Sequence, residues 1–581
     1  MLPRRRRRRG RRLWTVATAT VVALACTTAV STELLSSRPR EVIAVVAGSI
    51  DPAPTTTAIA DSDVYGMAQA DVDKTMDAIR SANVRSVRLL IPWAGVEATQ
   101  GQLDWSVVDK TVNSAAARQL SVVGVVNSSP IWAVAPGGQY LSGRPASPAT
   151  YGDFVAKVAS RYQGKIAALE IWNEPNGIQF YTPAPDPAGY VDLLKASYAK
   201  IKAVDPSIVV LGGSMGSILD YGAAAISPPN FLTQMYAAGA KGYFDALAFH
   251  PYHYSLKFSD GLQLEGSPLL QLMAMRKTMV ANGDGDKKIW STEYGEPSSQ
   301  GGDAVQNAFV TDILTKWQEL PYTGPMFVYT TRDGQSGGFN AVDTFGVLRA
   351  DWSPKPVLQT VQAAASGSLA KSAEFQRFST VNDPNLGTPL SPVYKVNAQN
   401  WAQIRTVATV YETASGFVTS PTPVAQKAGL YGTVPTTPFA NGYQDFDMYD
   451  GLRVWYSPAT GAHSARKGIY DAWTPALGLA ISDMTGGGLG SQCEFENGTI
   501  TWSPFGGARV TFKNGQTPGT PTTPPTTPPT TPGGPTTPPT TPGGPTPGGP
   551  TPGQPDQQNP ISAVLAFLLG IIGGLGGAVT R

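Results

Sequence analysis

Short runs of β-branched and aliphatic residues recur along the middle of the chain, and stretches with apolar residues at helical spacing, such as Val72–Ala82 and Tyr190–Ala203, lie between them. Strands that alternate with helices predict a parallel sheet. Eight repeats in about 300 residues favour an α/β fold, a closed (β/α)₈ TIM barrel over residues 61–366, with an open doubly wound sheet as the alternative. The eight predicted strands are Asp63–Met67, Ser86–Ile91, Ser121–Val126, Ile166–Trp172, Ile208–Gly212, Phe244–Phe249, Lys288–Glu293 and Pro325–Thr330.

The composition is that of a globular protein. Of the 581 residues, 41% are hydrophobic and 15% are charged, which fits neither a disordered chain nor a polytopic membrane protein. Eight of the 44 basic residues lie within the first twelve positions, so from Leu13 onward 36 basic residues stand against 42 acidic ones. This balance lacks the basic surface that a phosphate backbone requires, and nucleic acid is not expected as a partner.

Cysteine and histidine are scarce. The chain has two cysteines, and Cys26 lies in an apolar N-terminal stretch, so no disulfide framework is expected. Of the three histidines, His250 and His253 have a His-x-x-His spacing, but Pro251 prevents the helix that would place both imidazoles on one side. We therefore expect no metal and no cofactor. Carboxylates should carry most of the chemistry.

Both ends of the chain carry signals for export or attachment. The arginine run, the apolar stretch Leu13–Val22 and Ala23-Leu24-Ala25 have the three-part form of a secretory signal, which predicts a signal sequence over 1–30 and a linker over 31–60. Seventeen of the 50 prolines fall between 517 and 560, which predicts an extended stalk over 516–560. The charge-free segment Ile561–Thr580 is long enough to cross a bilayer, so 561–581 is a candidate membrane anchor; the alternative is an apolar tail on a surface.

Glutamates end two of the predicted strands. Glu174 ends the fourth within Ile-Trp-Asn-Glu-Pro-Asn, and Glu293 ends the seventh within Thr-Glu-Tyr-Gly. In a (β/α)₈ barrel, the reactive side chains sit at the C-terminal ends of the strands, where the βα loops meet. The two glutamates are therefore predicted to lie on opposite rims of one mouth.

These motifs resemble those of the large clan of retaining (β/α)₈ glycoside hydrolases, most closely family 39 and next family 5, over about 300 residues. In that clan the Glu of Asn-Glu-Pro is the general acid/base, the preceding Asn binds the 2-hydroxyl of the sugar, and the seventh-strand Glu is the nucleophile. The resemblance thus implies these roles for Glu174, Asn173 and Glu293. It also implies site roles for Arg88, His250 and Tyr252.

The chemistry of glycoside cleavage requires two such carboxyl groups. One protonates the leaving oxygen while the other stabilises or attacks the anomeric carbon, and a separation of about 5–5.5 Å gives a covalent intermediate with retained configuration. Two nearby glutamates are interpreted as non-catalytic, Glu170 as a buried structural partner and Glu296 as a loop residue. Further residues expected to line the site, from neighbouring strand ends, are Trp93, Asn127, Trp132 and Tyr329.

A competing motif lies at the fifth strand. Gly212-Gly213-Ser214-Met215-Gly216 fits the G-x-S-x-G nucleophile elbow of esterases. An esterase would also need an acid and a later histidine, and the nearest pair, Asp245 and His250, lies on a single strand end. We therefore favour the explanation that the glycines simply end a barrel strand.

The residues after the barrel form a second module, over 372–515, rich in glycine, tyrosine and tryptophan. Ser-Pro and Gly-Ala pairs recur 46 residues apart, which predicts stacked units that share a core. Leu386-Gly387-Thr388-Pro389 and the stretch Trp455–Trp473 resemble the LGFP repeats of exported cell-wall proteins, although Gly478 lacks the following proline. The resemblance implies binding to cell-wall glycan, and a purely structural β module is the alternative. Cys493 is expected to be a buried free thiol.

Together these features predict an exported retaining glycoside hydrolase of the cell envelope or the extracellular space, acting on a polysaccharide or oligosaccharide. A catalytically silent carbohydrate-binding or scaffold protein on the same barrel is the alternative from another class. A transglycosylase is a third reading. The sugar and the linkage depend on loop shapes that the sequence does not reveal.

Overall fold

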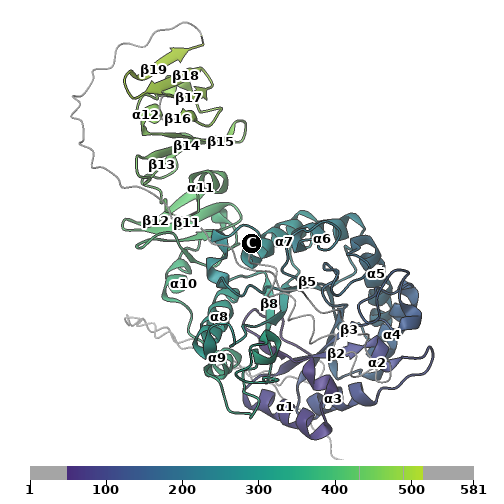
Figure 1. Ribbon diagram of the computed structural model, residues 1–581. Coiled ribbons are helices and arrows are strands. Elements are labelled where there is room, and N and C mark those ends of the chain that lie inside the picture. Colours follow the sequence, from purple (N-terminus) through teal and green to yellow (C-terminus); the bar gives the residue numbers. More distant parts are fainter. Residues whose placement is uncertain (1–48, 431, 488–489, 514–581) are drawn as a thin grey trace, which may run out of the picture. The chain divides into compact units, whose positions relative to one another are not determined.

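The computed structural model describes residues 49–430, 432–487 and 490–513 (Figure 1). The predicted signal sequence, stalk and apolar tail lie outside these residues. Within these three ranges, no helix is both long and apolar enough to cross a membrane.

Eight parallel strands close into a barrel in chain order, and β1 pairs with both β2 and β8 (Figure 1). This closure confirms the predicted (β/α)₈ barrel and excludes the open sheet. The strands are β1 Thr57–Ala60, β2 Ser86–Pro92, β3 Ser121–Asn127, β4 Ile166–Ile171, β5 Val209–Gly216, β6 Ala246–His250, β7 Ile289–Tyr294 and β8 Thr323–Tyr329.

Helices connect successive strands of the barrel. Five of them begin with proline, whose fixed φ suits a first helical turn, and three of those five are capped by the side chain of Ser147, Asp186 or Ser267. The helices of the barrel are α1 Gln69–Ser81, α2 Trp93–Val96, α3 Ser106–Ala117, α4 Pro148–Arg161, α5 Pro187–Val204, α6 Pro228–Ala237, α7 Pro268–Ala281, α8 Gly302–Trp317 and α9 Pro356–Ala365.

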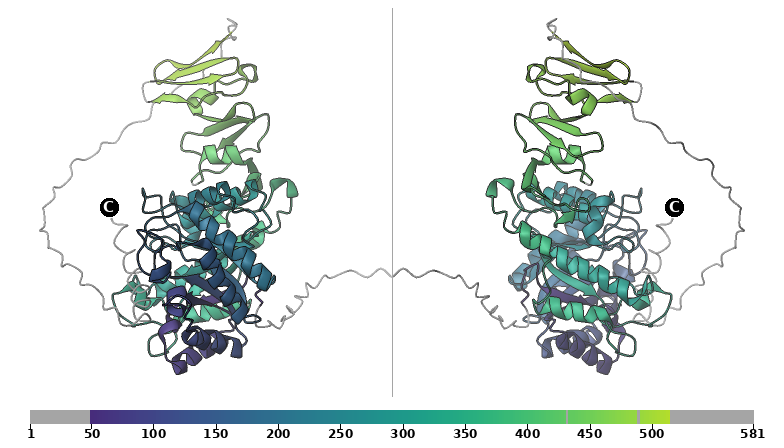
Figure 2. Two further views of the ribbon diagram at one scale, coloured as in Figure 1. Left: turned by 90° about the vertical axis from the view of Figure 1, so that its right-hand side faces the viewer. Right: turned by 90° about the vertical axis from the view of Figure 1, so that its left-hand side faces the viewer.

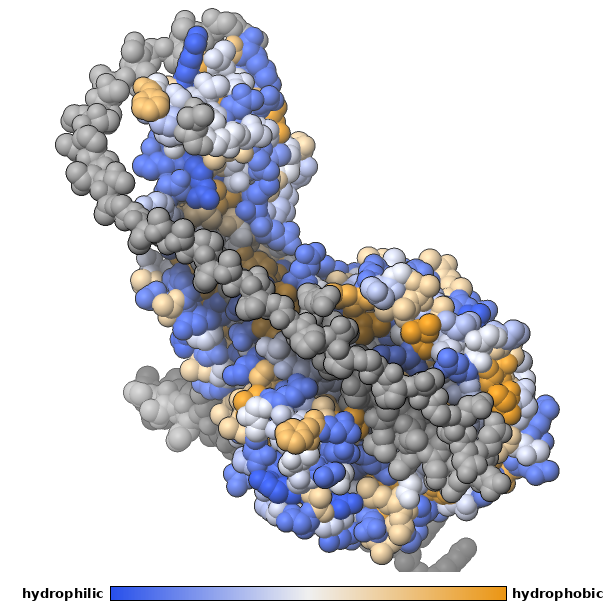
Figure 3. Space-filling view, in the orientation of Figure 1, coloured by the Kyte–Doolittle hydropathy of each residue, from blue (hydrophilic) through white to orange (hydrophobic). Residues whose placement is uncertain are grey.

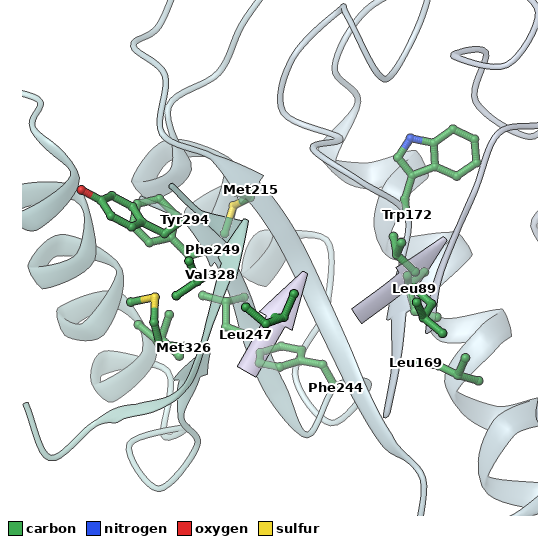
Figure 4. Packing of buried hydrophobic residues seen from close by; sticks show 14 of the residues in the cluster. Leu89, Leu169, Trp172, Met215, Phe244, Leu247, Phe249, Tyr294, Met326 and Val328 are labelled. Carbon is green, nitrogen blue, oxygen red and sulfur yellow. The ribbon is translucent and has the colours of Figure 1, made fainter. Parts of the chain in front are cut away.

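The barrel has two hydrophobic layers. Alternate side chains of the strands, among them Leu89, Leu247 and Val328, belong to a large cluster that includes the apolar residues of the helices (Figure 4). The remaining alternate positions form a separate smaller cluster of mostly small side chains, including Ala58, Ala168 and Ala248. A strand buried on both sides explains why the strands read as continuous apolar runs in the sequence.

The first strand differs from the prediction. The segment predicted as a strand, Asp63–Met67, is mostly a 3₁₀ turn over Asp63–Gly66, and the strand is Thr57–Ala60, the last four residues of the predicted linker. Asp61 and Ser62 explain the shift, because short polar side chains favour turns over strands. The correction places these polar residues at the C-terminal end of β1.

Three antiparallel sheets follow the barrel (Figures 1 and 2). Their strands are β9 Tyr394–Lys395, β10 Trp401–Ile404, β11 Ala408–Thr413 and β12 Gly416–Pro421; β13 Tyr443–Phe446, β14 Leu452–Ser457 and β15 Gly461–Arg466; and β16 Thr485–Gly487, β17 Gly490–Phe495, β18 Gly498–Ser503 and β19 Gly507–Phe512. Short helices are α10 Ala373–Phe378, α11 Thr422–Ala428 and α12 Lys467–Tyr470. The Tyr322 hydroxyl of the barrel donates a hydrogen bond to the Leu390 carbonyl, just before the first of these sheets.

The 46-residue repeat is visible in these sheets. The hairpins β14–β15 and β18–β19 have the same strand lengths and the same closing pair, Ser457 with Gly461 and Ser503 with Gly507. Gly387, Gly432 and Gly478, which share the period, all adopt positive φ between 73° and 80°. The repeat therefore encodes one hairpin unit, and glycine supplies the left-handed backbone each turn needs. Cys493 is a buried free thiol, as expected.

The surface is largely hydrophilic, with apolar side chains in separate patches (Figure 3). In the barrel, the large hydrophobic side chains that are exposed concentrate in the loops that follow the strands, and Val280 at the end of α7 is the exception among the described residues. Examples are Ile131, Leu219, Tyr221 and Phe339. The loops that follow the strands therefore carry most of the exposed large apolar side chains among the described residues of the barrel.

Candidate active site

The end of β4 adopts an unusual backbone. Trp172 and Glu174 both have positive φ, 68° and 45°, a region that costs free energy for residues with a side chain. The Glu174 amide donates to the Ser214 carbonyl of β5 at 2.9 Å, which holds this conformation. Strain of this kind is common where a side chain must be aimed at a site.

Gly216 makes room for the Glu174 side chain. A Cβ at Gly216 would lie 2.8 Å from the carboxyl carbon of Glu174 and 2.9–3.0 Å from its oxygens. Asn176 fixes this arrangement, since its side chain donates to the Gly216 carbonyl and accepts from the Gly216 amide, at 2.9 and 3.0 Å. The Asn-Glu-Pro-Asn motif therefore positions the carboxyl group and also holds the strand end next to it.

Glu293 at the end of β7 is held by two donors. The Arg88 guanidinium, a buried group on β2, forms an ion pair with Glu293 Oε1. The Tyr252 hydroxyl donates to Oε2 at 3.3 Å. Burial raises the pKa of Tyr252 well above its ordinary value, so this hydroxyl keeps its proton.

Glu170 acts as a buried structural partner, as the sequence suggested. It pairs with Arg88 Nε and accepts hydrogen bonds from the hydroxyls of Ser214 and Thr292, at 2.7 and 2.6 Å. Burial alone would raise the pKa of Glu170, but Arg88 and His250 lower it to about 2. Arg88 also donates to the Asn173 side chain at 2.8 Å, so one guanidinium orients three site residues.

His250 at the end of β6 brings the two glutamates together. Its Nδ1 lies 2.8 Å from Glu174 Oε1 and 3.9 Å from Glu293 Oε2, so these two oxygens are no more than 6.7 Å apart, the sum of the two distances. Burial alone would lower the pKa of His250, but the charges of Glu293, Glu170 and Glu174 raise it to about 9. At neutral pH the ring is therefore cationic and donates to Glu174.

The two glutamates line one pocket, and each side chain is 15% exposed. The pocket is also lined by five other residues predicted from the sequence, Arg88, Asn127, Asn173, Tyr252 and Tyr329. His250 is fully buried and contacts the site through Glu174 and Thr292. The structure thus gathers eight of the ten predicted residues at one place.

Trp93 and Trp132 correct the prediction, because neither lines the pocket. The Trp93 indole is buried, packs against Phe154 and Trp132 and donates to Glu97 at 2.8 Å. Trp132 donates to the Glu97 carbonyl at 2.9 Å. Both tryptophans follow strand ends, but the Trp93 ring packs against Phe154 of α4 and the Trp132 ring packs edge-on against Trp93.

The sequence prediction missed several residues that line the pocket: Ser62, Asp63, Leu90, Val125, Phe180, Tyr254 and Phe345. Two of these residues are ionisable: Asp63, through its carboxyl group, and Tyr254, through its hydroxyl. The signal that would have found Asp63 is the polar run Asp61-Ser62-Asp63 directly after a short apolar segment, and misplacing the first strand concealed that signal.

The esterase motif has a structural role. Ser214 is fully buried and donates to Glu170, Gly213 has a positive φ of 89°, and Gly216 accommodates Glu174. In the part of the chain that the structure describes, no histidine forms a hydrogen bond with the Ser214 hydroxyl, which donates to Glu170 instead. In the same residues, no cluster of three histidine, cysteine or acidic side chains is arranged to hold a metal ion.

Comparison with known proteins gave no match among protein-family models and none among curated proteins. Solved structures that resemble the chain include a family 39 glycoside hydrolase from the gut symbiont Bacteroides cellulosilyticus WH2, with 19% identity, coverage of 71% of this chain and 79% of that chain, and a TM-score of 0.47. A monomeric beta-xylosidase from Caulobacter crescentus CB15 has 14% identity, coverage of 62% and 74%, and a TM-score of 0.41. A GH5_18 protein from Streptomyces cattleya, in complex with GlcNAc, has 15% identity, coverage of 56% and 82%, and a TM-score of 0.42. The first is described as a family 39 glycoside hydrolase and the third as a GH5_18 protein.

Proposed function

We propose that the protein is a retaining glycoside hydrolase that cleaves O-glycosidic bonds of a polysaccharide or oligosaccharide by double displacement. One observation carries the proposal: Glu174 and Glu293 line a single pocket and both lie within 4 Å of His250 Nδ1. Paired carboxyl groups at this distance are what cleavage through an oxocarbenium-like transition state needs.

The separation of the two carboxyl groups favours the retaining route. Their facing oxygens are at most 6.7 Å apart, a bound that includes the separation of about 5–5.5 Å in retaining enzymes and reaches only the lower edge of the range of about 6.5–9.5 Å in inverting ones. Glu293 is suited to attack the anomeric carbon, because Arg88 balances its charge and Tyr252 orients it.

Glu174 is suited to move the proton in both steps. It protonates the leaving oxygen as Glu293 forms the glycosyl–enzyme bond, and it then removes a proton from the water that hydrolyses this bond. His250 hydrogen-bonds to Glu174 and supplies a positive charge beside the carboxylate that remains after proton transfer. Asn173, fixed by Arg88, is placed to bind a sugar hydroxyl.

We also propose that the protein acts outside the cytoplasm, at the cell envelope. The N-terminal arginine run with its apolar stretch, the proline-rich segment 516–560 and the apolar segment 561–581 support export and attachment. The resemblance of Leu386-Gly387-Thr388-Pro389 and Trp455–Trp473 to LGFP repeats supports binding to envelope glycan, and a pull-down of the full chain with purified cell-wall glycan tests this role. No retention on the glycan would leave the module a structural one.

A mechanism-based probe tests the enzymatic proposal. Cyclophellitol-type probes of several sugar configurations should label the wild-type protein, and mass spectrometry should place the label on Glu293. Glu293→Gln should not be labelled, while Glu496→Gln, a change of the same kind in the C-terminal module, should be labelled like the wild type. Absence of labelling together with absence of hydrolysis across a panel of aryl β-glycosides would leave the protein a carbohydrate-binding one. Adding a sugar acceptor and analysing the products separates hydrolysis from transglycosylation.

A further inference from the structure

The pocket holds a third carboxyl group besides the two glutamates. Asp63 comes from the 3₁₀ turn after β1 and lines the same pocket as Glu174 and Glu293. Its side chain is partly exposed, and within the described residues it has no hydrogen-bond or ion-pair partner. Its neighbour Asp61 is instead buried and accepts the Val64 amide. Asp63 therefore presents an acceptor that the protein itself leaves unused.

The surroundings of Asp63 are acidic. Burial is the main reason that its pKa rises to about 7, and the charges of Asp61, Asp343 and Glu293 add to the rise. Arg332 acts in the opposite direction, but it does not line the pocket, and its guanidinium lies over the Trp352 ring at 4.6 Å.

The pocket has no spare positive charge among its described lining residues. Its one basic residue, Arg88, is already paired with both Glu170 and Glu293. His250 lies behind Glu174 and is hydrogen-bonded to it. A sugar carboxylate in this pocket would meet three acidic side chains without a free cation, whereas a sugar hydroxyl would find an acceptor ready.

The position of Asp63 indicates which part of the substrate it meets. The Glu293 charge is among those that act on Asp63. In the barrel β1 is adjacent to β8, and β8 is adjacent to β7, which carries Glu293. Since the acid/base stands beside the leaving group, a residue nearer the nucleophile faces the sugar ring that forms the covalent intermediate.

We infer that Asp63 is a substrate-binding residue that accepts hydrogen bonds from hydroxyls of this sugar ring, and that the pocket selects a neutral sugar and rejects a uronic acid. The inference rests on the proposed glycosidase function and narrows it to a substrate class. In its ionised form, which predominates above the pKa of about 7, Asp63 would form charge-assisted hydrogen bonds to these hydroxyls, about twice as strong as neutral ones.

The test compares substrates that differ in one group. Aryl β-glucoside with β-glucuronide, and aryl β-galactoside with β-galacturonide, differ only at C6. In the pair that the wild type cleaves faster, its kcat/KM for the neutral glycoside should be at least about 100-fold higher than for the matching uronide. Asp63→Ala should lower kcat/KM for that neutral substrate by about 10- to 100-fold, the range for losing a hydrogen bond to a charged group. Asp63→Asn keeps an acceptor oxygen, so its kcat/KM for the neutral substrate should fall less. In both variants, the ratio of kcat/KM for the neutral substrate to that for the uronide should be smaller than in the wild type.

Asp192→Ala, an exposed change on the outer helix α5, is the matched control and should behave like the wild type. Circular dichroism tests whether each variant folds. If Asp63→Ala does not fold, Asp63→Asn takes its place in the comparison. A wild type that prefers the uronide, or an Asp63→Ala variant with unchanged kcat/KM, overturns the inference while the glycosidase stands.

A catalytically silent wild type would overturn the proposed function alone. In that case calorimetric titration of the wild type and Asp63→Ala with the same glucoside and glucuronide decides the inference. Binding of the neutral glycoside that weakens in the variant supports it. Equal binding of the glucoside to both proteins, or no binding of the glucoside to the wild type, contradicts it.

Discussion

Replacing Gly216 by alanine tests whether Glu174 acts from the position that the structure assigns to it. The new Cβ would lie 2.8 Å from the Glu174 carboxyl carbon, whereas carbon atoms in contact prefer about 3.5 Å, so the carboxyl group must move by roughly 0.7 Å. Gly216 does not have a positive φ, so alanine is compatible with its backbone. The substitution therefore displaces the side chain of one residue and leaves the strand in place.

The expected cost follows from the role of Glu174. The displacement breaks the 2.8 Å hydrogen bond to His250 and misaligns the proton donor. A misplacement of about 1 Å is enough to reduce a rate by about 100-fold, which corresponds to about 3 kcal/mol of transition-state stabilisation. The loss should be greatest for aryl glycosides with poor leaving groups, because these need the proton, and small for dinitrophenyl glycosides, which do not.

Steady-state kinetics over a series of aryl leaving groups measures this effect. Gly212→Ala is the matched control on the same strand, since its Cβ would crowd Phe244 at 3.0 Å and Leu194 at 3.3 Å without contacting Glu174. It should lower the melting temperature without changing the dependence on leaving group. A Gly216→Ala protein that folds and still cleaves poor leaving groups at the wild-type rate would refute the reasoning, as would an equal loss in Gly212→Ala.

Two further predictions concern stability. Burial raises the pKa of Glu296 to about 8, and both of its carboxyl oxygens lack hydrogen-bond partners within the described residues. Because this group ionises more readily in the unfolded chain, the free energy of unfolding should fall by about 4 kcal/mol as pH rises from 4.5 to 8. Urea titrations at pH 5 and 8 should show this fall in the wild type and not in Glu296→Gln. Arg88→Met should destabilise the barrel by about 3–5 kcal/mol at pH 7, because it leaves Glu170 and Glu293 without their cation. Because the pKa of Glu170 is lowered to about 2 in the folded protein, its ionisation adds stability above pH 4.5, and the wild type loses this stability as pH falls toward 2. Arg88→Met should lose less stability over the same pH range. An Arg88→Met protein as stable as the wild type at pH 7 would contradict the role of the ion pair.

The barrel was predictable because its strands are buried on both faces and its helices alternate with them at regular spacing. Seven of the eight strands appear where the apolar runs placed them. The first failed because Thr57–Ala60 has four residues, two of them alanine, and so carries little of the β-branched signal that marks a strand. Small side chains suit the barrel interior, where Ala58 and Ala60 lie, but packing of this kind is not visible in a local window.

The two catalytic candidates were predictable because they follow strand ends within specific motifs. The lining residues were less so. Trp93 and Asn127 both stand at strand ends, and only side-chain packing turns Trp93 into the layer beside Phe154 and Asn127 into the pocket. Asp63 needed the correct first strand before its position became visible. The role of Gly216 depends on a tertiary contact with Glu174 that no local pattern encodes.

Azide rescue tests most directly the claim that Glu293 attacks and Glu174 moves the proton. Each glutamate is replaced by alanine, the variant is supplied with an activated aryl glycoside and sodium azide, and the anomeric configuration of the glycosyl azide is read by NMR. The account predicts retained configuration with Glu174→Ala, because Glu293 still forms the intermediate, and inverted configuration with Glu293→Ala, because azide then attacks in its place. Inversion with Glu174→Ala, or the same configuration from both variants, would contradict it.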